Sequence, residues 1–493
     1  MKRIIPGLAV ICSVFLSFSA GAQEKTVKLT LEDALKIALS ENVSVKVADM
    51  EIERSEYAKK GTYSSLFPQI NASGSYQRTI KKQVMYMGGG DDEEGGGGMA
   101  SMFAGIFDPI YYYINGIMQE TGVVIPPYVP PVVEQESSTD DGIAVGRMNT
   151  YNFGVSASMP LVNAQLWQSL KISGQSVDLA VEKARSSRLE MVTQVKQAFY
   201  AALLAKEALG VYGSVYDNAV ENFNKTESRY KVQKASELEY TRAKTAVASA
   251  IPNVYNAEGS VILALWQLKA VMGVDLDMDV DIVGSLGDYA DTMFRDIHEN
   301  EDFTLDYNST MRQLAIQAEQ LASTIRMQKY AYLPTLSATF SYSMNAMTND
   351  FKFSEYKWTP YSFVGLSLSI PIFSGGKRYH DIKQSKVQLA ELDLQRVNTE
   401  RQLKIAIRQY LNTMETNMKS YSSSEEAVKL AEKAYDITAK SYNVGKSTLT
   451  DLNDSQLQLT QARLAQSQAV YNFMVAKASL EQMIGKDFVA DNR

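Results

Sequence analysis

Apolar and small polar residues alternate along four stretches of the chain, each roughly ten residues long. In one of them, Leu336, Ala338 and Phe340 alternate with serine and threonine. A period of two residues is typical of a β-strand with one apolar and one polar face. The pattern fits a half-buried soluble sheet as well as tilted strands that cross a bilayer. The predicted strands span about 68–78, 150–161, 334–345 and 359–372.

Two far longer stretches, from Asn163 to about Val232 and from Ser374 to about Val444, contain no proline. About seventy helical residues at 1.5 Å each form a rod of about 100 Å, much longer than a helix in a globular domain. The last part of the chain carries a sustained heptad pattern, which predicts that the rods pack along a coiled-coil seam. The seam residues are Leu452, Ser455, Leu459, Ala462, Gln466, Ala469, Phe473, Ala476, Leu480 and Met483.

Similar segments occur twice along the chain. The segment "YNFGVSASMPL" (151–161) resembles "YSFVGLSLSIPI" (361–372), and "RYKVQKASELEYTRA" (229–243) resembles "SYNVGKSTLTDLNDS" (441–455). Because the matching segments occur in the same order, we interpret the chain as a duplicated helix-strand-strand-helix unit.

The duplication also predicts how the chain is divided. Pro371 and the Gly375–Gly376 pair lie where a strand must turn into a rod, because proline ends strand pairing and glycine permits unusual dihedrals. The expected segments are a signal peptide (1–22), a first repeat (23–275) with its tip at about 229–240, an equatorial linker (276–307), and a second repeat (308–493) with its tip at about 441–455.

The N-terminus has the pattern of a secretory signal peptide. Lys2 and Arg3 precede an apolar run, and Ala20-Gly21-Ala22 is a small-residue cleavage site. The single cysteine, Cys12, lies inside the run, so we expect neither disulfides nor a lipid-modified cysteine in the mature chain. The net charge of −7 gives no reason to expect a nucleic-acid partner. Export, together with aromatic residues at the strand ends, favours strands that cross an outer membrane.

Four strands are too few to close a membrane barrel, since single-chain barrels begin at about eight strands. An open sheet edge in lipid leaves backbone groups without hydrogen bonds, at several kcal/mol each. The chain is therefore expected to oligomerise, with two copies giving eight strands or three copies giving twelve.

The duplicated unit, with the motifs "IPIFSGGK" and "YNVGKSTLTDLND", resembles the TolC family of outer-membrane efflux proteins over nearly the whole mature chain. The resemblance implies a mixed α/β membrane fold in a homotrimer. Four transmembrane β-strands per chain would form a twelve-stranded β-barrel in the lipid of a Gram-negative outer membrane, continued by a long periplasmic α-helical barrel. It further implies export of small molecules or polypeptides in tripartite efflux or type I secretion. The implied partners are a periplasmic adaptor protein and an inner-membrane pump of the RND or ABC type, with no cofactor.

The resemblance also implies which residues close the periplasmic entrance. Two positions depart from the family pattern: Ser447 replaces the gating arginine, beside Lys446, and Gln233 replaces the glycine of the first tip. The implied gate residues are Tyr442, Lys446, Ser447, Asp451, Asp454 and Glu239. The implied adaptor contacts are Gln233, Lys234, Ser236, Gly445 and Thr448.

Asp451 and Asp454 also have a simpler interpretation. Residues three apart share a helix face, and acids near a helix N-terminus are favoured by the helix dipole even on a solvated face. In a trimer that places them on the axis, they would instead form a ring of six carboxylates able to hold cations.

Two features leave other readings open. The inter-strand loop, about 79–149, contains "GGGDDEEGGGG" and "IPPYVPPVV" and is expected to be extracellular, either as a solvated loop or as a cover for the mouth. The mature chain has only His298 and His380, and it lacks HExxH, GxSxG and phosphate-loop patterns, so no enzyme is expected. The alternatives are a structural or adhesive coiled-coil barrel protein without a transport role and, less favoured, a barrel hydrolase that uses His380.

Overall fold

The computed structural model describes residues 27–85, 109–114, 116–117, 143–295 and 304–487. The predicted signal peptide and most of the predicted extracellular loop lie outside the described residues. The chain forms two compact units. The strand unit comprises Ser65–Val162 and Thr335–Ser369, and the helical unit comprises the remaining segments, up to Ser64, Asn163–Pro334 and from Ile370 onward.

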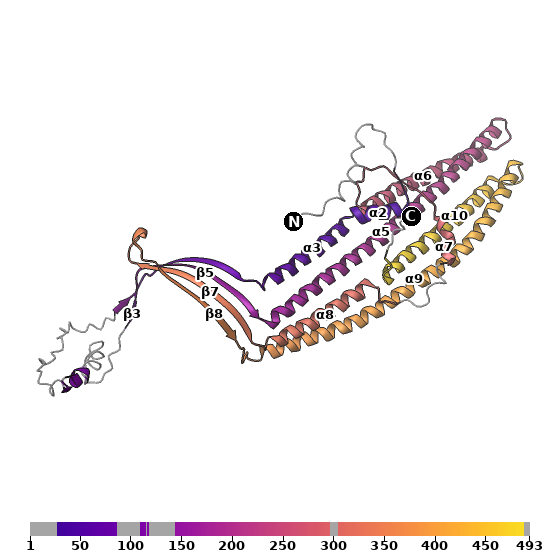
Figure 1. Ribbon diagram of the computed structural model, residues 1–493. Helices are drawn as coiled ribbons and strands as arrows, with labels where there is room; N and C mark the ends of the chain where they lie inside the picture. Colours follow the sequence, from indigo (N-terminus) through magenta and orange to yellow (C-terminus); the bar gives the residue numbers. More distant parts are fainter. Residues whose placement is uncertain (1–26, 86–108, 115, 118–142, 296–303, 488–493) are drawn as a thin grey trace, which may run out of the picture. The chain divides into compact units, whose positions relative to one another are not determined.

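The main sheet of the strand unit is antiparallel, with the order β2-β5-β7-β8. Compared with the expected bounds, the third strand starts one residue later and ends three residues later, and the fourth strand ends three residues earlier. Strand β7 begins directly after Pro334 and β8 ends two residues before Pro371, and neither proline has a backbone N–H to donate to a neighbouring strand. The strands are β2 (Gln69–Arg78), β5 (Asn149–Val162), β7 (Thr335–Thr348) and β8 (Thr359–Ser369), and a short hairpin adds β3 (Gln83–Met85) and β4 (Ile143–Val145) (Figure 1).

The register of the sheet brings the apolar positions of all four strands onto one face. One row across the sheet runs Ile70, Ala157, Phe340, Val364, and the next row runs Asn71, Ser156, Ser341, Phe363. The apolar face is open in the single chain, where Val364 is 79% exposed. The polar face also carries two aromatic residues, Phe363 and Tyr361, whose ring centres lie 5.8 Å apart.

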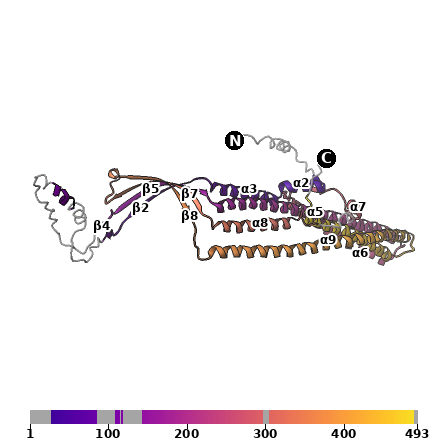
Figure 2. The same cartoon turned by 60° about the horizontal axis from the view of Figure 1, so that its bottom comes forward.

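Two very long helices run through the helical unit (Figure 2). Helix α5 (Ala164–Lys231) has 68 residues and α9 (Lys377–Asn443) has 67, over the two stretches without proline. Helix α5 packs against α3 (Val43–Ser64), α6 (Glu237–Met272), α8 (Ser309–Tyr330) and α10 (Leu449–Ile484), and α9 packs against α8 and α10. Among the described helices, none combines the length and apolar character needed to cross a bilayer.

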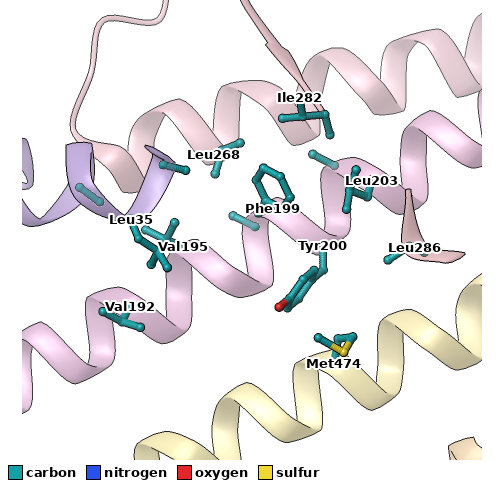
Figure 3. Close-up of a cluster of buried hydrophobic side chains, with 14 of the residues drawn as sticks. Leu35, Val192, Val195, Phe199, Tyr200, Leu203, Leu268, Ile282, Leu286 and Met474 are labelled. Carbon is teal, nitrogen blue, oxygen red and sulfur yellow. The ribbon is translucent and has the colours of Figure 1, made fainter. Parts of the chain in front are cut away.

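The main hydrophobic core surrounds the middle of α5 (Figure 3). Phe199 and Leu203 are almost completely buried there, and burial of each such side chain contributes about 1.5–3 kcal/mol. The described part of the predicted linker belongs to this core. The neighbouring elements are β1 (Val27–Leu29), its parallel partner β6 (Val280–Ile282), α2 (Leu31–Glu41), the 3-10 helix η1 (Leu286–Tyr289) and α7 (Ala290–Arg295).

The heptad seam of α10 faces inward. All ten residues of the predicted seam are buried or half-buried, from Leu452 to Met483. Beside the seam, Asn218 of α5 donates a hydrogen bond to Gln456 of α10 at 3.1 Å. The coiled-coil prediction is therefore confirmed for the packing of α10 within one chain.

Candidate gate at the two helical hairpin tips

The helical unit contains two helical hairpins with matching turns. We call α5–α6 the first hairpin and α9–α10 the second. In the first turn, the Lys234 N–H donates to the Arg229 carbonyl at 2.8 Å; in the second, the Lys446 N–H donates to the Ser441 carbonyl at 2.8 Å. This bond pattern satisfies the last carbonyls of a helix and requires a left-handed residue just before the donor lysine.

That left-handed position is filled differently in the two hairpins. Gly445 has φ +76° in the second, whereas Gln233 has φ +57° in the first. Gln233 is the only non-glycine residue with a positive φ in the part of the chain that the structure describes. An L-residue other than glycine in this conformation raises the free energy of the folded chain by about 1–2 kcal/mol. Gln233, which stands where glycine is expected, therefore strains the first turn.

The returning helices begin with matching capping boxes. In α10 the Thr448 N–H and hydroxyl donate to Asp451 Oδ2 at 2.9 and 2.7 Å, and the Asp451 N–H donates back to Thr448 Oγ1 at 3.1 Å. In α6 the Ser236 N–H donates to Glu239 Oε2 at 2.8 Å, and the Glu239 N–H donates back to Ser236 Oγ at 3.2 Å. Two of the predicted gate acids therefore hold helix N-termini in place.

The hydrogen bonds also fix the charge of Asp451. The bonds from Thr448, together with one from the Ser447 hydroxyl at 3.2 Å, lower the pKa of Asp451 below its ordinary value of 3.8. Asp454 and Lys446 are exposed, and neither forms an ion pair with any residue that the structure describes. The structure thus brings Ser447, Thr448 and Asp451 together and leaves Asp454 and Lys446 facing solvent in the single chain.

Tyr442, which the resemblance implies is a gating tyrosine, is buried within the chain. Only 6% of it is exposed, and its hydroxyl lies 2.9 Å from the Thr226 hydroxyl of α5. Its neighbours in this small core include Leu449 and Leu452 of α10 and Ala243 of α6. The tyrosine therefore joins the two hairpins to each other within one chain.

Arg229 of α5 makes a second connection between the first hairpin and the end of α9. Arg229 was not identified as a gate residue from the sequence. Its guanidinium donates to the backbone carbonyls of Asn443 at 2.6 Å and Tyr442 at 3.5 Å, and it lies 5.6 Å from the centre of the Tyr442 ring. A cation at the C-terminal end of α9 interacts favourably with the helix dipole. The sequence signal was present, because the repeats align Arg229 with Ser441, so the two tips differ at this position.

A cleft lined by both apolar and polar side chains lies between the two hairpins. It is lined by residues of α5, α6, α9 and α10, among them Asn218, Asn222, Tyr435, Asn453 and Gln456. Among the described residues, no group of three or more His, Asp or Glu side chains lies close enough together to hold a metal ion.

The model of the family described as "Outer membrane efflux protein" matches residues 133–274 and 303–486. The chain therefore belongs to the outer membrane efflux protein family, whose members reside in the outer membrane.

Individual proteins show the same relationship. Outer membrane protein TolC of Escherichia coli (strain K12) is 19% identical over 351 residues, 68% of this chain and 70% of that protein. Proteases secretion protein PrtF of Dickeya chrysanthemi is 20% identical over 373 residues, 72% of this chain and 76% of that protein. The Campylobacter jejuni CmeC outer membrane channel has a similar fold, with a TM-score of 0.65 at 16% identity, covering 94% of this chain and 87% of that one.

The first prediction concerns the strained turn. Gln233→Gly should stabilise the first hairpin by up to about 1 kcal/mol, and Gly445→Gln should destabilise the second by about 1 kcal/mol, because only glycine adopts a positive φ without a steric penalty. Hydrogen exchange of the amides in each turn measures both effects. A loss of protection on Gln233→Gly would show that the glutamine side chain contributes more than the backbone strain costs.

The second prediction concerns pH. The pKa of Asp451 is lower in the folded chain than in the unfolded chain. The ionised carboxylate therefore stabilises the fold fully at a pH above the unfolded-state pKa, and this stabilisation is lost as the pH falls through the folded-state pKa. Protection of the first turn of α10 against hydrogen exchange should therefore decline below about pH 4. Asp451→Asn should have low protection already at neutral pH and no such decline, whereas Asp454→Asn, outside the cap, should behave like the native chain.

Proposed function

We propose that this protein is one protomer of an outer-membrane channel that exports small molecules or polypeptides. The observation that carries the proposal is the two-faced sheet, which places apolar residues on one face and mostly small polar residues on the other. Among the described residues, the outer edges of β2 and β8 have no strand partner. An apolar outside and a polar inside are what a water-filled barrel in lipid requires. Membership of the outer membrane efflux protein family supports this placement.

Three copies would complete the channel. Pairing β8 of one protomer with β2 of the next would close a twelve-stranded barrel, and the long helices would form a periplasmic helical barrel. The resemblance to the TolC family supports three copies rather than two. In this arrangement residues 1–22 direct export, the loop of residues 79–149 lies outside the cell, and the linker 276–307 surrounds the helical barrel at its equator.

The channel would act as the outer component of a larger export complex. Similarity to a proteases secretion protein and to the CmeC channel supports a role beside a periplasmic adaptor and an inner-membrane pump of the RND or ABC type. We place the adaptor contacts at the two turns, on Gln233, Lys234, Ser236, Gly445 and Thr448, because these residues are exposed and lie at the hairpin ends.

The hairpin tips would form the periplasmic gate. Asp451 and Asp454 of three protomers would give a ring of six carboxylates, with Lys446 and Ser447 beside them and Glu239 on the first hairpin. Within each protomer, Tyr442 links the second hairpin to α5, so opening requires the second hairpin either to leave α5 or to move together with it. Arg229 strengthens the same link and belongs to the proposed gate.

The third prediction tests assembly and conduction. In detergent the mature protein should have about three times the mass of a chain of about 52 kDa, since an isolated protomer would leave two sheet edges unpaired. In planar bilayers the trimer should conduct ions. A stable folded monomer would contradict the architecture, and a trimer without conductance would favour the structural or adhesive role. Hydrolysis of ester substrates by the purified trimer would favour the hydrolase.

The fourth prediction tests which face of the sheet meets lipid. Phe340→Lys should destabilise the membrane-inserted protein by about 2–4 kcal/mol, whereas Ser341→Lys, one residue along the same strand, should leave stability nearly unchanged and shift ion selectivity toward anions. Urea unfolding in lipid vesicles and reversal potentials provide the two readings. The opposite ranking would mean that the polar face meets lipid.

The fifth prediction tests the gate. Asp454→Asn should weaken block by multivalent cations added from the periplasmic side, because it removes three of the six carboxylates without disturbing the helix cap. Arg229→Met should raise the resting conductance, whereas Lys231→Met should not, because the one ion pair of Lys231 among the described residues is with Glu227 of its own helix. Cation block that survives removal of both Asp451 and Asp454 would place these acids on a solvated face instead.

A further inference from the structure

Four helix ends meet at the end of the helical unit where the chain leaves for the strands and returns from them. Helix α3 packs against α5, α5 against α8 and α8 against α9, so the C-terminal ends of α3 and α8 and the N-terminal ends of α5 and α9 lie in one row (Figures 1 and 2). The side chains of this row are not used by the channel or the gate described above.

This row is strongly basic. The segments 53–64, 163–174, 323–334 and 374–386 together contain ten Lys and Arg but only three Asp and Glu, a net charge of +7, whereas the whole chain carries −7. An excess of positive charge of this size, in a chain that is negative overall, forms a surface that attracts negatively charged partners.

Each of the four helix ends also pairs a basic residue with an aromatic one at a spacing of three or four. Lys60 lies 4.9 Å from the ring centre of Tyr57, and Lys383 lies 5.6 Å from that of Tyr379. The aromatic rings are exposed, Tyr57 by 61%. The four pairs are Tyr57 with Lys60, Trp167 with Lys171, Arg326 with Tyr330, and Tyr379 with Lys383.

Folding within the chain does not account for these cations. Lys171, Arg326, Lys329, Lys383 and Lys386 are exposed and form no ion pair with any described residue. The helix dipole favours cations at the C-terminal ends of α3 and α8, but it disfavours them at the N-terminal ends of α5 and α9. Cations therefore occur at both kinds of helix end, and the helix dipole explains only those at the C-terminal ends of α3 and α8.

We call the basic and aromatic side chains of these four helix ends (53–64, 163–174, 323–334 and 374–386) the basic-aromatic belt. We propose that this belt binds the anionic headgroups of phospholipids, in particular phosphatidylglycerol, at the periplasmic surface of the outer membrane. The proposal rests on the proposed function, which puts the adjoining strands in the bilayer. Tyrosine and tryptophan prefer the depth of the headgroups, and lysine and arginine beside them attract lipid phosphates. The belt would fix how deeply the channel sits in the membrane and hold an annulus of anionic lipid around it.

The test measures lipid retained by the intact protein. The trimer is reconstituted with phosphatidylethanolamine and phosphatidylglycerol, stripped with mild detergent, and its remaining phospholipid is identified by mass spectrometry. Retained lipid should be enriched in phosphatidylglycerol, by roughly fivefold for each cation that contacts the anionic surface. The enrichment should fall as salt is raised, because salt screens exposed charges.

Two matched variants locate the effect. The belt variant carries Lys171→Gln, Arg326→Gln, Lys329→Gln and Lys386→Gln. The control variant carries Lys244→Gln, Arg401→Gln, Arg408→Gln and Lys433→Gln, four exposed cations farther along α6 and α9 that also lack ion pairs among the described residues. The belt variant should lose most of the enrichment, and the control should keep it.

The outcomes separate this proposal from the proposed function. Enrichment that is absent in the native protein, or equal in both variants, would overturn the belt. A belt variant that loses the trimer without any change in lipid preference would show that these cations contact a neighbouring copy, which also overturns it. Conductance is recorded in the same bilayers: its absence in every lipid would contradict the channel, and its presence without lipid enrichment would contradict only the belt.

Discussion

The backbone groups along the outer edges of the sheet impose the constraint on which the rest of the molecule depends. Within the described part of the chain, β2 pairs only with β5 and β8 pairs only with β7. In lipid each unpaired group costs several kcal/mol, so one copy cannot remain alone in a membrane. A duplicated unit that supplies two strands per repeat can satisfy these edges only through other copies. In the proposed trimer, the symmetry of the channel would therefore follow from an unmet hydrogen-bonding requirement.

The two hairpins of the duplicated unit share their backbone geometry but differ in the side chains around their turns. Both turns use the same backbone bonds, and both returning helices start with a capping box. The side chains around them differ. Tyr230 of the first hairpin stacks on Tyr240 and stays partly exposed, whereas the equivalent Tyr442 is buried and bonded to Thr226. In the contact between the hairpins, the first supplies Arg229 and the second supplies the backbone carbonyls that it binds.

The sequence predicted the elements whose signals are local. Alternation located the four strands to within three residues, and the lack of proline located α5 and α9, because both patterns depend on neighbours in the chain. The contacts of Tyr442 were not predictable in the same way. They join residues more than two hundred positions apart, and nothing in the spacing of Thr226 or Arg229 points to α9. The family resemblance supplied a role for Tyr442 but not its partners in this chain.

Asp451 can cap α10 and also serve in the proposed gate, because the two roles use different oxygens of its carboxylate. All of its described hydrogen bonds reach one carboxylate oxygen, Oδ2, which leaves Oδ1 available to face an ion or another protomer. The same bonds lower the pKa of Asp451, so they keep the carboxylate ionised and fix its direction. A ring of like charges on flexible side chains would spread apart or take up protons to reduce repulsion. A carboxylate anchored by a helix cap can do neither easily, so the cap is what would make Asp451 effective as a fixed charge at the entrance.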